Sequence, residues 1–302
     1  MATASDKVRR ARPLLGTFVE IEAAGAARSE LDAAIDAAFE AVARVHRLMS
    51  FHEPDSDVSR LNRETSLPPV KVHAWTFQVL QVAVEMHRQT KGIFDVAIAP
   101  ALQTMGLLPR LEGDAAIVTE ARSFDAIELL PENVVRFRYP DVRIDLGGIA
   151  KGFAVDRALA ALRGFDISSG MVNAGGDLAA FGQDPHIVHI RHPRDPRRLI
   201  CAVEITDEAL ASTARRFDLF QSAETSGSAI IDPLTGRPTE ANDGATVRAR
   251  SCMVADALTK IVMIAGTEVS ELLEHYNASA LLVSTDGDVR ITPDWHSVHL
   301  AA

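Results

Sequence analysis

The chain has 302 residues, of which 47% are hydrophobic and 24% are charged. This composition is ordinary for a globular protein and supplies enough apolar residues for one large or two medium domains. The formal net charge of -10 disfavours general nucleic-acid binding, because the phosphate backbone attracts basic proteins.

The N-terminus carries no pattern of a secretory leader. Basic residues precede a short apolar run that breaks at Gly16, whereas a leader needs a longer apolar region. No stretch approaches the roughly 18 apolar residues of a membrane helix, and no lipobox cysteine lies near the start. We therefore expect a cytoplasmic protein without membrane insertion.

Hydrophobic periodicity predicts helices and strands along the whole chain. Alternation over 18–22 favours a strand, and the apolar positions between 29 and 49 share one helical face. A second helix over 74–91 ends at Gly92. Further helices are expected at 251–265 and 268–275, and further strands at 127–130, 134–137, 186–192, 199–205, 245–249, 280–284 and 289–292. Since no repeat or linker divides the chain, we expect a single domain over 1–302.

The most informative stretch runs from 143 to 182. A short apolar run at 144–146 precedes two glycines and Lys151, after which apolar residues recur at helical spacing. The pattern predicts a strand, a glycine turn and a helix. Bare backbone N–H groups and the helix dipole favour an anion at such a helix N-terminus, and Lys151 adds a positive charge there.

A second pair of glycines, at 175–176, follows another apolar run and precedes Asp177. Two such units together favour a cleft for a phosphate-bearing ligand. The simpler interpretation also stands, since paired glycines often form only a tight turn and Asp145 can be a helix cap. Neither a P-loop nor a G-x-G-x-x-G motif is present.

Seven segments, in order, resemble the FAD:protein FMN transferases, the ApbE family. They read LLGTFVEI, MSFHEPDSDVSRLN, GIFDVAIAP, IDLGGIAKGFAVDRAL, VNAGGDLAAFG, IIDPLTGRP and VADALTK, so the family motifs lie within about 14–265. The resemblance implies an α+β fold with two lobes of mixed sheet and helices around a central FAD cleft. It also implies FMN transfer from FAD to a Ser or Thr hydroxyl of a target flavoprotein, with release of AMP and with Mg²⁺ beside the pyrophosphate.

The resemblance implies roles for individual positions as well. Lys151 and Asp256 match catalytic positions. Gly148, through its backbone carbonyl, Asp256 and Thr259 are the candidate magnesium ligands, in keeping with the preference of Mg²⁺ for oxygen. The positions that match flavin contacts are Leu15, His52, Phe94, Asp95, Asp145, Lys151 and Ile230.

The chain departs from the family pattern at four places. The His that commonly precedes Ile-Ile-Asp-Pro, a candidate acid or base, is here Ala229. The second side-chain metal ligand, a Thr in the family, is here Lys260, with Thr259 one residue early. The Thr-Ser-Gly segment of the family is here Ser-Thr-Ala at 212–214, and a Tyr of the family is here His52. A protonated lysine cannot ligate magnesium, although its charge can replace part of the role of the metal.

Three functions therefore remain open from the sequence. The first is an FMN transferase with a modified site. The second is a flavin-binding protein without transfer activity, and the third is an FAD pyrophosphate hydrolase in which water replaces the acceptor. The sequence identifies neither the acceptor protein nor the oligomeric state.

Overall fold

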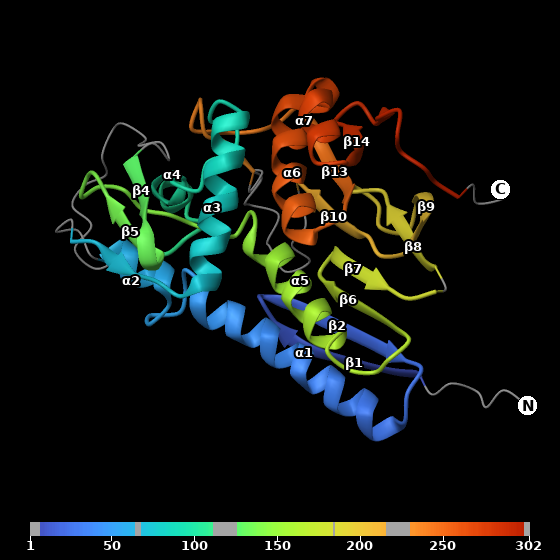
Figure 1. The fold of residues 1–302 in the computed structure, drawn as a ribbon. Helices are drawn as coiled ribbons and strands as arrows, with labels where there is room; N and C mark the ends of the chain where they lie inside the picture. The colour runs from blue at the N-terminus through green and yellow to red at the C-terminus, as the bar shows by residue number, and fades with distance from the viewer. Residues whose placement is uncertain (1–6, 64–67, 111–125, 184, 216–229, 299–302) are drawn as a thin grey trace, which may run out of the picture. The chain divides into compact units, whose positions relative to one another are not determined.

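The computed structural model describes residues 7–63, 68–110, 126–183, 185–215 and 230–298. Helices and β-strands are both present throughout these ranges, which confirms the predicted α+β class (Figure 1). The chain divides into two compact units. The first comprises Met1–Arg44, Lys151–Phe217 and Ala241–Ala302, and the second comprises Val45–Ala150 and Asp218–Glu240.

The first unit is built on an 8-stranded sheet in which every pair of neighbouring strands is antiparallel. The order of strands in space is the order in the sequence. The strands are β1 (Lys7–Leu14), β2 (Thr17–Ala24), β6 (Ser169–Ala174), β7 (Asp177–Phe181), β10 (Ala209–Ala214), β13 (Asn242–Ala249), β14 (Ser279–Ser284) and β15 (Val289–Ile291).

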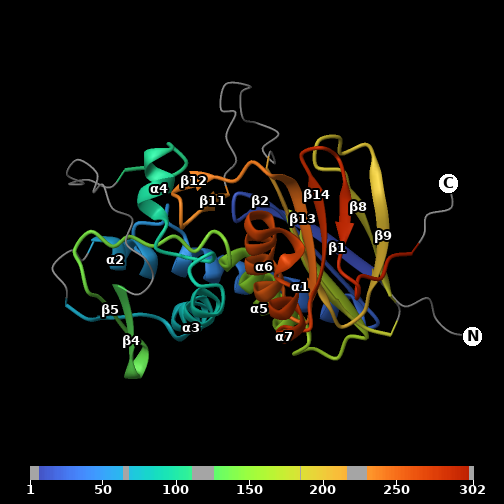
Figure 2. The ribbon, with the colours of Figure 1, turned by 90° about the horizontal axis from the view of Figure 1, so that it is seen from above.

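Helices cover one face of this sheet and a β-hairpin covers the other (Figure 2). The helices are α1 (Arg28–Met49), α5 (Ala150–Leu162), α6 (Cys252–Ala265), the short η3 (Gly266–Glu268) and α7 (Ser270–His275), and the hairpin pairs β8 (His186–Arg191) with β9 (Leu199–Ile205). Leu178 and Leu210 of the sheet pack with Val203 of the hairpin in a buried apolar cluster. Strands β7 and β14, inside the sheet, are therefore buried on both faces.

The second unit contains two small antiparallel sheets and short helices. One sheet has the order β3 (Val70–Lys71), β5 (Val134–Phe137) and β4 (Ile127–Leu130), and the other pairs β11 (Ile231–Asp232) with β12 (Arg237–Pro238). The helices that lie wholly in this unit are α2 (Asp57–Arg63), α3 (Ala74–Gln89), α4 (Ala99–Thr104) and η2 (Pro131–Asn133).

The strand predicted at 144–146 is wrong, because these residues form no ladder with a neighbouring strand. The Asn62 side chain takes the place of a strand: its Oδ1 accepts from the N–H of Ile144 at 2.8 Å, and its Nδ2 donates to the carbonyl of Ile144 at 2.9 Å. The next amide, of Asp145, donates to the carbonyl of Val96 at 2.8 Å. The backbone is thus satisfied without a sheet.

Strand β1 was not predicted, because its sequence KVRRARPL lacks apolar alternation. It is an edge strand whose arginines are paired with acids of neighbouring elements. Arg9 lies 2.5 Å from Glu20 of β2, and Arg10 lies 2.5 Å from Asp36 of α1. These contacts let a charged segment occupy a sheet edge, which also discourages association with other chains.

Over the part of the chain that the structure describes, none of the helices combines the length and apolar character needed to cross a membrane.

Candidate functional site

Helix α6 of the first unit is capped from another helix. The carboxylate of Asp156, in α5, accepts from the N–H groups of Cys252 at 2.7 Å and Met253 at 2.9 Å, and from the Ser251 hydroxyl at 2.7 Å. A carboxylate at this position satisfies free N–H groups and complements the helix dipole. The contact therefore fixes the start of α6 against α5.

Gly152 allows the two helices to approach this closely. A Cβ atom at this position would lie 2.2 Å from the carbonyl oxygen of Cys252 and 2.8 Å from Cβ of Asp256. The N–H of Gly152 donates to Oδ2 of Asp256 at 3.0 Å. The close packing thus brings the buried Asp256 carboxylate directly against the N-terminal part of α5.

Four charged side chains and one hydroxyl gather at this point, and we call them the charged cluster: Lys151, Asp177, Asp256, Lys260 and Thr213. The Nζ of Lys151 donates to Oδ2 of Asp177 at 2.6 Å. The Nζ of Lys260 donates to Oδ1 of Asp256 and, at 3.0 Å, to the Thr213 hydroxyl. The side chains of Asp177 and Asp256 are both 0% exposed, so each depends on a lysine for compensation.

The pKa directions agree with this pairing. Burial alone would raise the pKa of Asp256, but Lys260 and Lys151 together lower it below its usual value. Burial alone would lower the pKa of Lys151, but the carboxylates of Asp177 and Asp256 raise it overall. For Asp177, burial and the neighbouring Asp256 raise the pKa, while Lys151 opposes this. Asp256 therefore stays an anion and Lys151 a cation.

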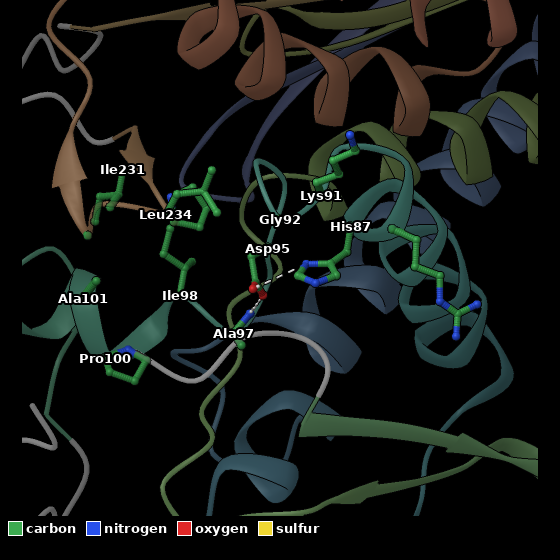
Figure 3. Close-up of a pocket in the computed structure, with 13 residues that line it drawn as sticks. His87, Lys91, Gly92, Asp95, Ala97, Ile98, Pro100, Ala101, Ile231 and Leu234 are labelled. Atoms are coloured by element: carbon green, nitrogen blue, oxygen red, sulfur yellow. Dashed lines mark hydrogen bonds and ion pairs between the residues drawn. The ribbon is translucent and has the colours of Figure 1, made fainter. Parts of the chain in front are cut away.

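The second unit contains a pocket of about 470 Å³, lined by the end of α3, the segment that leads into α4 and the turn between β11 and β12 (Figure 3). His87 and Asp95 point toward each other on one wall, with Nδ1 of His87 3.5 Å from Oδ2 of Asp95. Oδ1 of Asp95 accepts from the N–H of Ala97 at 2.7 Å. Ile231 and Leu234 give the pocket an apolar side.

Asp145 lies in the same unit, on the segment that bonds to Val96. Its Oδ2 accepts from the N–H of Gly147 at 3.0 Å, so the carboxylate stabilises the glycine turn that precedes α5. Burial raises the pKa of Asp145, while the bond from Gly147 and the nearby His52 oppose the shift. Asp145 thus bonds within the turn rather than to a free N–H group of α5, which begins at Ala150, and its side chain stays half-buried.

The predicted site residues fall into two groups, one in each unit. The first unit holds Leu15, Lys151, Asp256 and Thr259, and the second holds His52, Phe94, Asp95, Asp145, Gly148 and Ile230. Within the first group, Lys151 and Asp256 meet in the charged cluster. Within the second, Phe94 and Asp95 directly precede Val96, whose carbonyl accepts from the N–H of Asp145. His52 is exposed. Ala229 lies outside the described residues.

Three residues of these sites were missed by sequence reasoning. Asp177 belongs to the segment VNAGGDLAAFG but received no role. Asn62, which positions Ile144, ends the segment MSFHEPDSDVSRLN and also received none. His87 offers no sequence signal, because a single histidine near the end of a helix is common on a polar face.

Leu15 has a backbone conformation that its side chain does not favour. Leu15 and Gly16 form the two-residue loop between β1 and β2, and their φ angles are +56° and +70°. Positive φ at both positions is what a type I′ hairpin turn requires, and Asn-Gly is its preferred sequence. A strained residue of this kind is often kept for function.

We expect Leu15→Asn to stabilise the protein by about 1 kcal/mol, the cost of a left-handed conformation for an ordinary side chain. If Leu15 contacts the flavin, the same change weakens FAD binding. Urea unfolding and FAD fluorescence titration measure the two effects. Asn277→Gly, at an exposed residue with φ of +48°, is the control and should leave FAD affinity unchanged. Unaltered FAD affinity in Leu15→Asn would contradict the flavin contact.

Comparison with known proteins agrees with the sequence resemblance. The model of the ApbE family matches residues 15–289. The chain is similar to the FAD:protein FMN transferase of Vibrio cholerae serotype O1, with 30% identity over 300 residues that cover 94% of this chain and 89% of the relative. It is also similar to the FAD:protein FMN transferase of Escherichia coli strain K12, with 26% identity over 80% of this chain and 74% of the relative.

Two solved structures share the fold. The flavin transferase ApbE from Vibrio cholerae has a TM-score of 0.79 at 27% sequence identity, covering 96% of this chain and 98% of its own. The ApbE protein of Thermotoga maritima has a TM-score of 0.83 at 24% identity, covering 95% and 97%, and supports the fold alone. With the motif order, the family match and these folds in agreement, the chain belongs to the ApbE family.

Proposed function

We propose that this chain is an enzyme that transfers FMN from FAD to a Ser or Thr hydroxyl of a target flavoprotein and releases AMP. The observation that supports this best is the 30% identity, over 94% of the chain, to the Vibrio cholerae FAD:protein FMN transferase. The glycine turn and Lys151 at the start of α5 fit a pyrophosphate, because a helix N-terminus and an ammonium group both favour anions.

The reaction exchanges one phosphorus–oxygen bond for another. The acceptor hydroxyl oxygen attacks the phosphorus on the flavin side of FAD, and the bond from that phosphorus to the AMP oxygen breaks. AMP leaves with the bonding electron pair, and the hydroxyl proton passes to a base, because a Ser or Thr hydroxyl is a weak nucleophile unaided.

Lys151 is the residue that we assign to the charge on the phosphates. Its ammonium group is fixed by Asp177, so it is already oriented before FAD binds. A positioned cation that meets developing charge needs no rearrangement during the reaction, which is the main advantage of such sites. About a third of the side chain as a whole stays exposed (33%).

The magnesium ion that the resemblance implies does not fit the donor set in the first unit. Both carboxylate oxygens of Asp256 already accept hydrogen bonds, from Gly152 and from Lys260. The Thr259 hydroxyl donates to the main-chain oxygen of Asp256 at 2.7 Å. We therefore assign no step of the reaction to a metal, and the ligand roles of Gly148, Asp256 and Thr259 stay predictions from the family resemblance.

The remaining assignments are also part of this proposal. Leu15, His52, Phe94, Asp95, Asp145, Lys151 and Ile230 are proposed to contact FAD. The pocket beside Asp95 supports a flavin ring there, because its walls combine a carboxylate with the apolar side chains Ile231 and Leu234. We also propose that the whole chain acts as one domain, in the cytoplasm.

The test is to incubate the purified protein with FAD and an acceptor protein that carries a flavinylation-type Ser or Thr. We expect the acceptor to gain an FMN group, read by intact mass, and AMP to appear on chromatography in equal amount. An acceptor with that Ser or Thr changed to Ala is the control and should gain nothing.

Two other results would select the alternatives. Formation of AMP and free FMN without an acceptor would identify an FAD pyrophosphate hydrolase. Bound FAD, seen by absorbance, with no product in either reaction would identify a flavin-binding protein without transfer activity. Either result would overturn the transferase proposal.

A further inference from the structure

We propose that Lys260 supplies the positive charge at Asp256 that a divalent cation would otherwise supply, so that this site works without Mg²⁺. The inference rests on the proposed function, because it concerns the phosphate-binding part of the same site. It is carried by the contacts of Lys260 in the charged cluster.

Lys260 follows Asp256 by one turn of α6, in an i,i+4 relation. Its Nζ donates to Oδ1 of Asp256 and to the Thr213 hydroxyl. The side chain of Lys260 is only 15% exposed and that of Asp256 is 0% exposed. The ammonium group is therefore inside the cluster, on the carboxylate oxygen that Gly152 does not use.

The charges of the cluster cancel. Lys151 and Lys260 contribute two positive charges, and Asp177 and Asp256 contribute two negative charges. A divalent cation placed here would add two charges that no side chain of the cluster compensates, in buried surroundings where uncompensated charge is costly. With a neutral residue at position 260, the same cluster would carry one negative charge and would attract a cation.

The neighbouring hydroxyl groups are also engaged. The hydroxyl of Thr259 lies 2.8 Å from that of Thr213 and donates to the main-chain oxygen of Asp256. Thr213 accepts from Lys260. Across the described residues, moreover, no group of three or more His, Cys, Asp or Glu side chains is arranged to hold a metal ion. The carboxylate oxygens of Asp256 and the hydroxyl groups of Thr213 and Thr259, oxygens of the kind that Mg²⁺ prefers, are thus already engaged by protein groups. Oδ1 of Asp177, which is buried and has no hydrogen-bond partner in the part of the chain that the structure describes, is the exception among the carboxylate oxygens of the cluster, and its other oxygen accepts from Lys151.

The direct test measures Mn²⁺, as a probe for Mg²⁺, by the electron paramagnetic resonance signal of the free ion. The full-length protein, with and without FAD, should bind Mn²⁺ no more tightly than FAD alone does. Lys260→Thr should bind it at least tenfold more tightly, because the change removes a positive charge and adds an oxygen ligand. Lys260→Met separates the two effects, since it removes only the charge.

Lys71→Thr, at an exposed lysine in β3, is the matched control and should behave as the unaltered protein. Tight Mn²⁺ binding by the unaltered protein, with no gain in Lys260→Thr, would overturn the inference. Circular dichroism confirms that each variant is folded before binding is compared.

Activity provides a second readout. Transfer by the unaltered protein should be the same within twofold in EDTA and in Mg²⁺, whereas transfer by Lys260→Thr should require Mg²⁺. Loss of transfer by the unaltered protein in EDTA would overturn the inference. If neither protein transfers FMN under any condition, the proposed function fails, and the Mn²⁺ measurement still decides the role of Lys260.

Discussion

Lys151→Met is expected to lower the free energy of unfolding by about 3 kcal/mol and to reduce FMN transfer at least a hundredfold. The stability loss follows because Asp177, 0% exposed, would keep a buried charge without its partner. Breaking a buried pair from one side costs about 3–5 kcal/mol, and we take the lower end because 33% of the Lys151 side chain is exposed. Urea unfolding and the acceptor mass assay measure the two losses.

A double variant separates stability from function at this pair. Lys151→Met with Asp177→Asn removes both charges, so most of the lost stability should return while transfer stays absent. Lys71→Met, at an exposed lysine, is the control for loss of a lysine and should change neither quantity. If the double variant regained transfer together with stability, Lys151 would be a structural residue only.

The second large effect is expected at Gly152. Alanine is the better helix former by about 1 kcal/mol, so helix propensity alone would favour Gly152→Ala. The structure predicts the opposite, because the new Cβ would lie 2.2 Å from a backbone oxygen of Cys252, which cannot rotate away. Overpacking of this kind costs about 1–3 kcal/mol and occasionally more, and the Gly152–Asp256 bond would be lost as well. We expect a net loss of about 3 kcal/mol, measured by urea unfolding.

Gly164→Ala is the control for this substitution. Gly164 follows α5, is exposed, and its added Cβ would meet only the carbonyl oxygen of Ala161 at 3.2 Å. Its stability should stay within about 1 kcal/mol of the original. A similar loss in both variants would mean that the contact between α5 and α6 is not the cause.

The sequence predicted those elements whose own pattern decides their structure. The helical face of α1 and the apolar alternation of β2 are examples, because the spacing of the apolar residues predicts which face is buried. Strand β1 was missed because its pairing depends on acids elsewhere, such as Asp36 and Glu20. The false strand at 144–146 has the same origin, since Asn62 supplies its hydrogen bonds from 82 residues away.

The candidate site shows the same difference between what local sequence predicts and what depends on distant contacts. The order of motifs identified the family and the segments around Lys151, Asp177 and Asp256. It did not show that Lys260 and Asp256 are bonded to each other, or that Lys151 is held by Asp177, because those contacts depend on three-dimensional packing. The pairing of His87 with Asp95 was equally hidden, since neither residue carries a motif that names the other.

The order of strands in the 8-stranded sheet has a consequence for how the protein is made. The strands follow one another in the sheet in the same order as in the sequence. Each strand that leaves the ribosome can therefore pair with the edge strand formed before it, and none has to insert between earlier strands. Asp177 enters with β7, long before α6 brings Asp256 and Lys260. Until then the nascent chain holds Lys151 and Asp177 without the second pair, so the charged cluster is completed only near the end of synthesis.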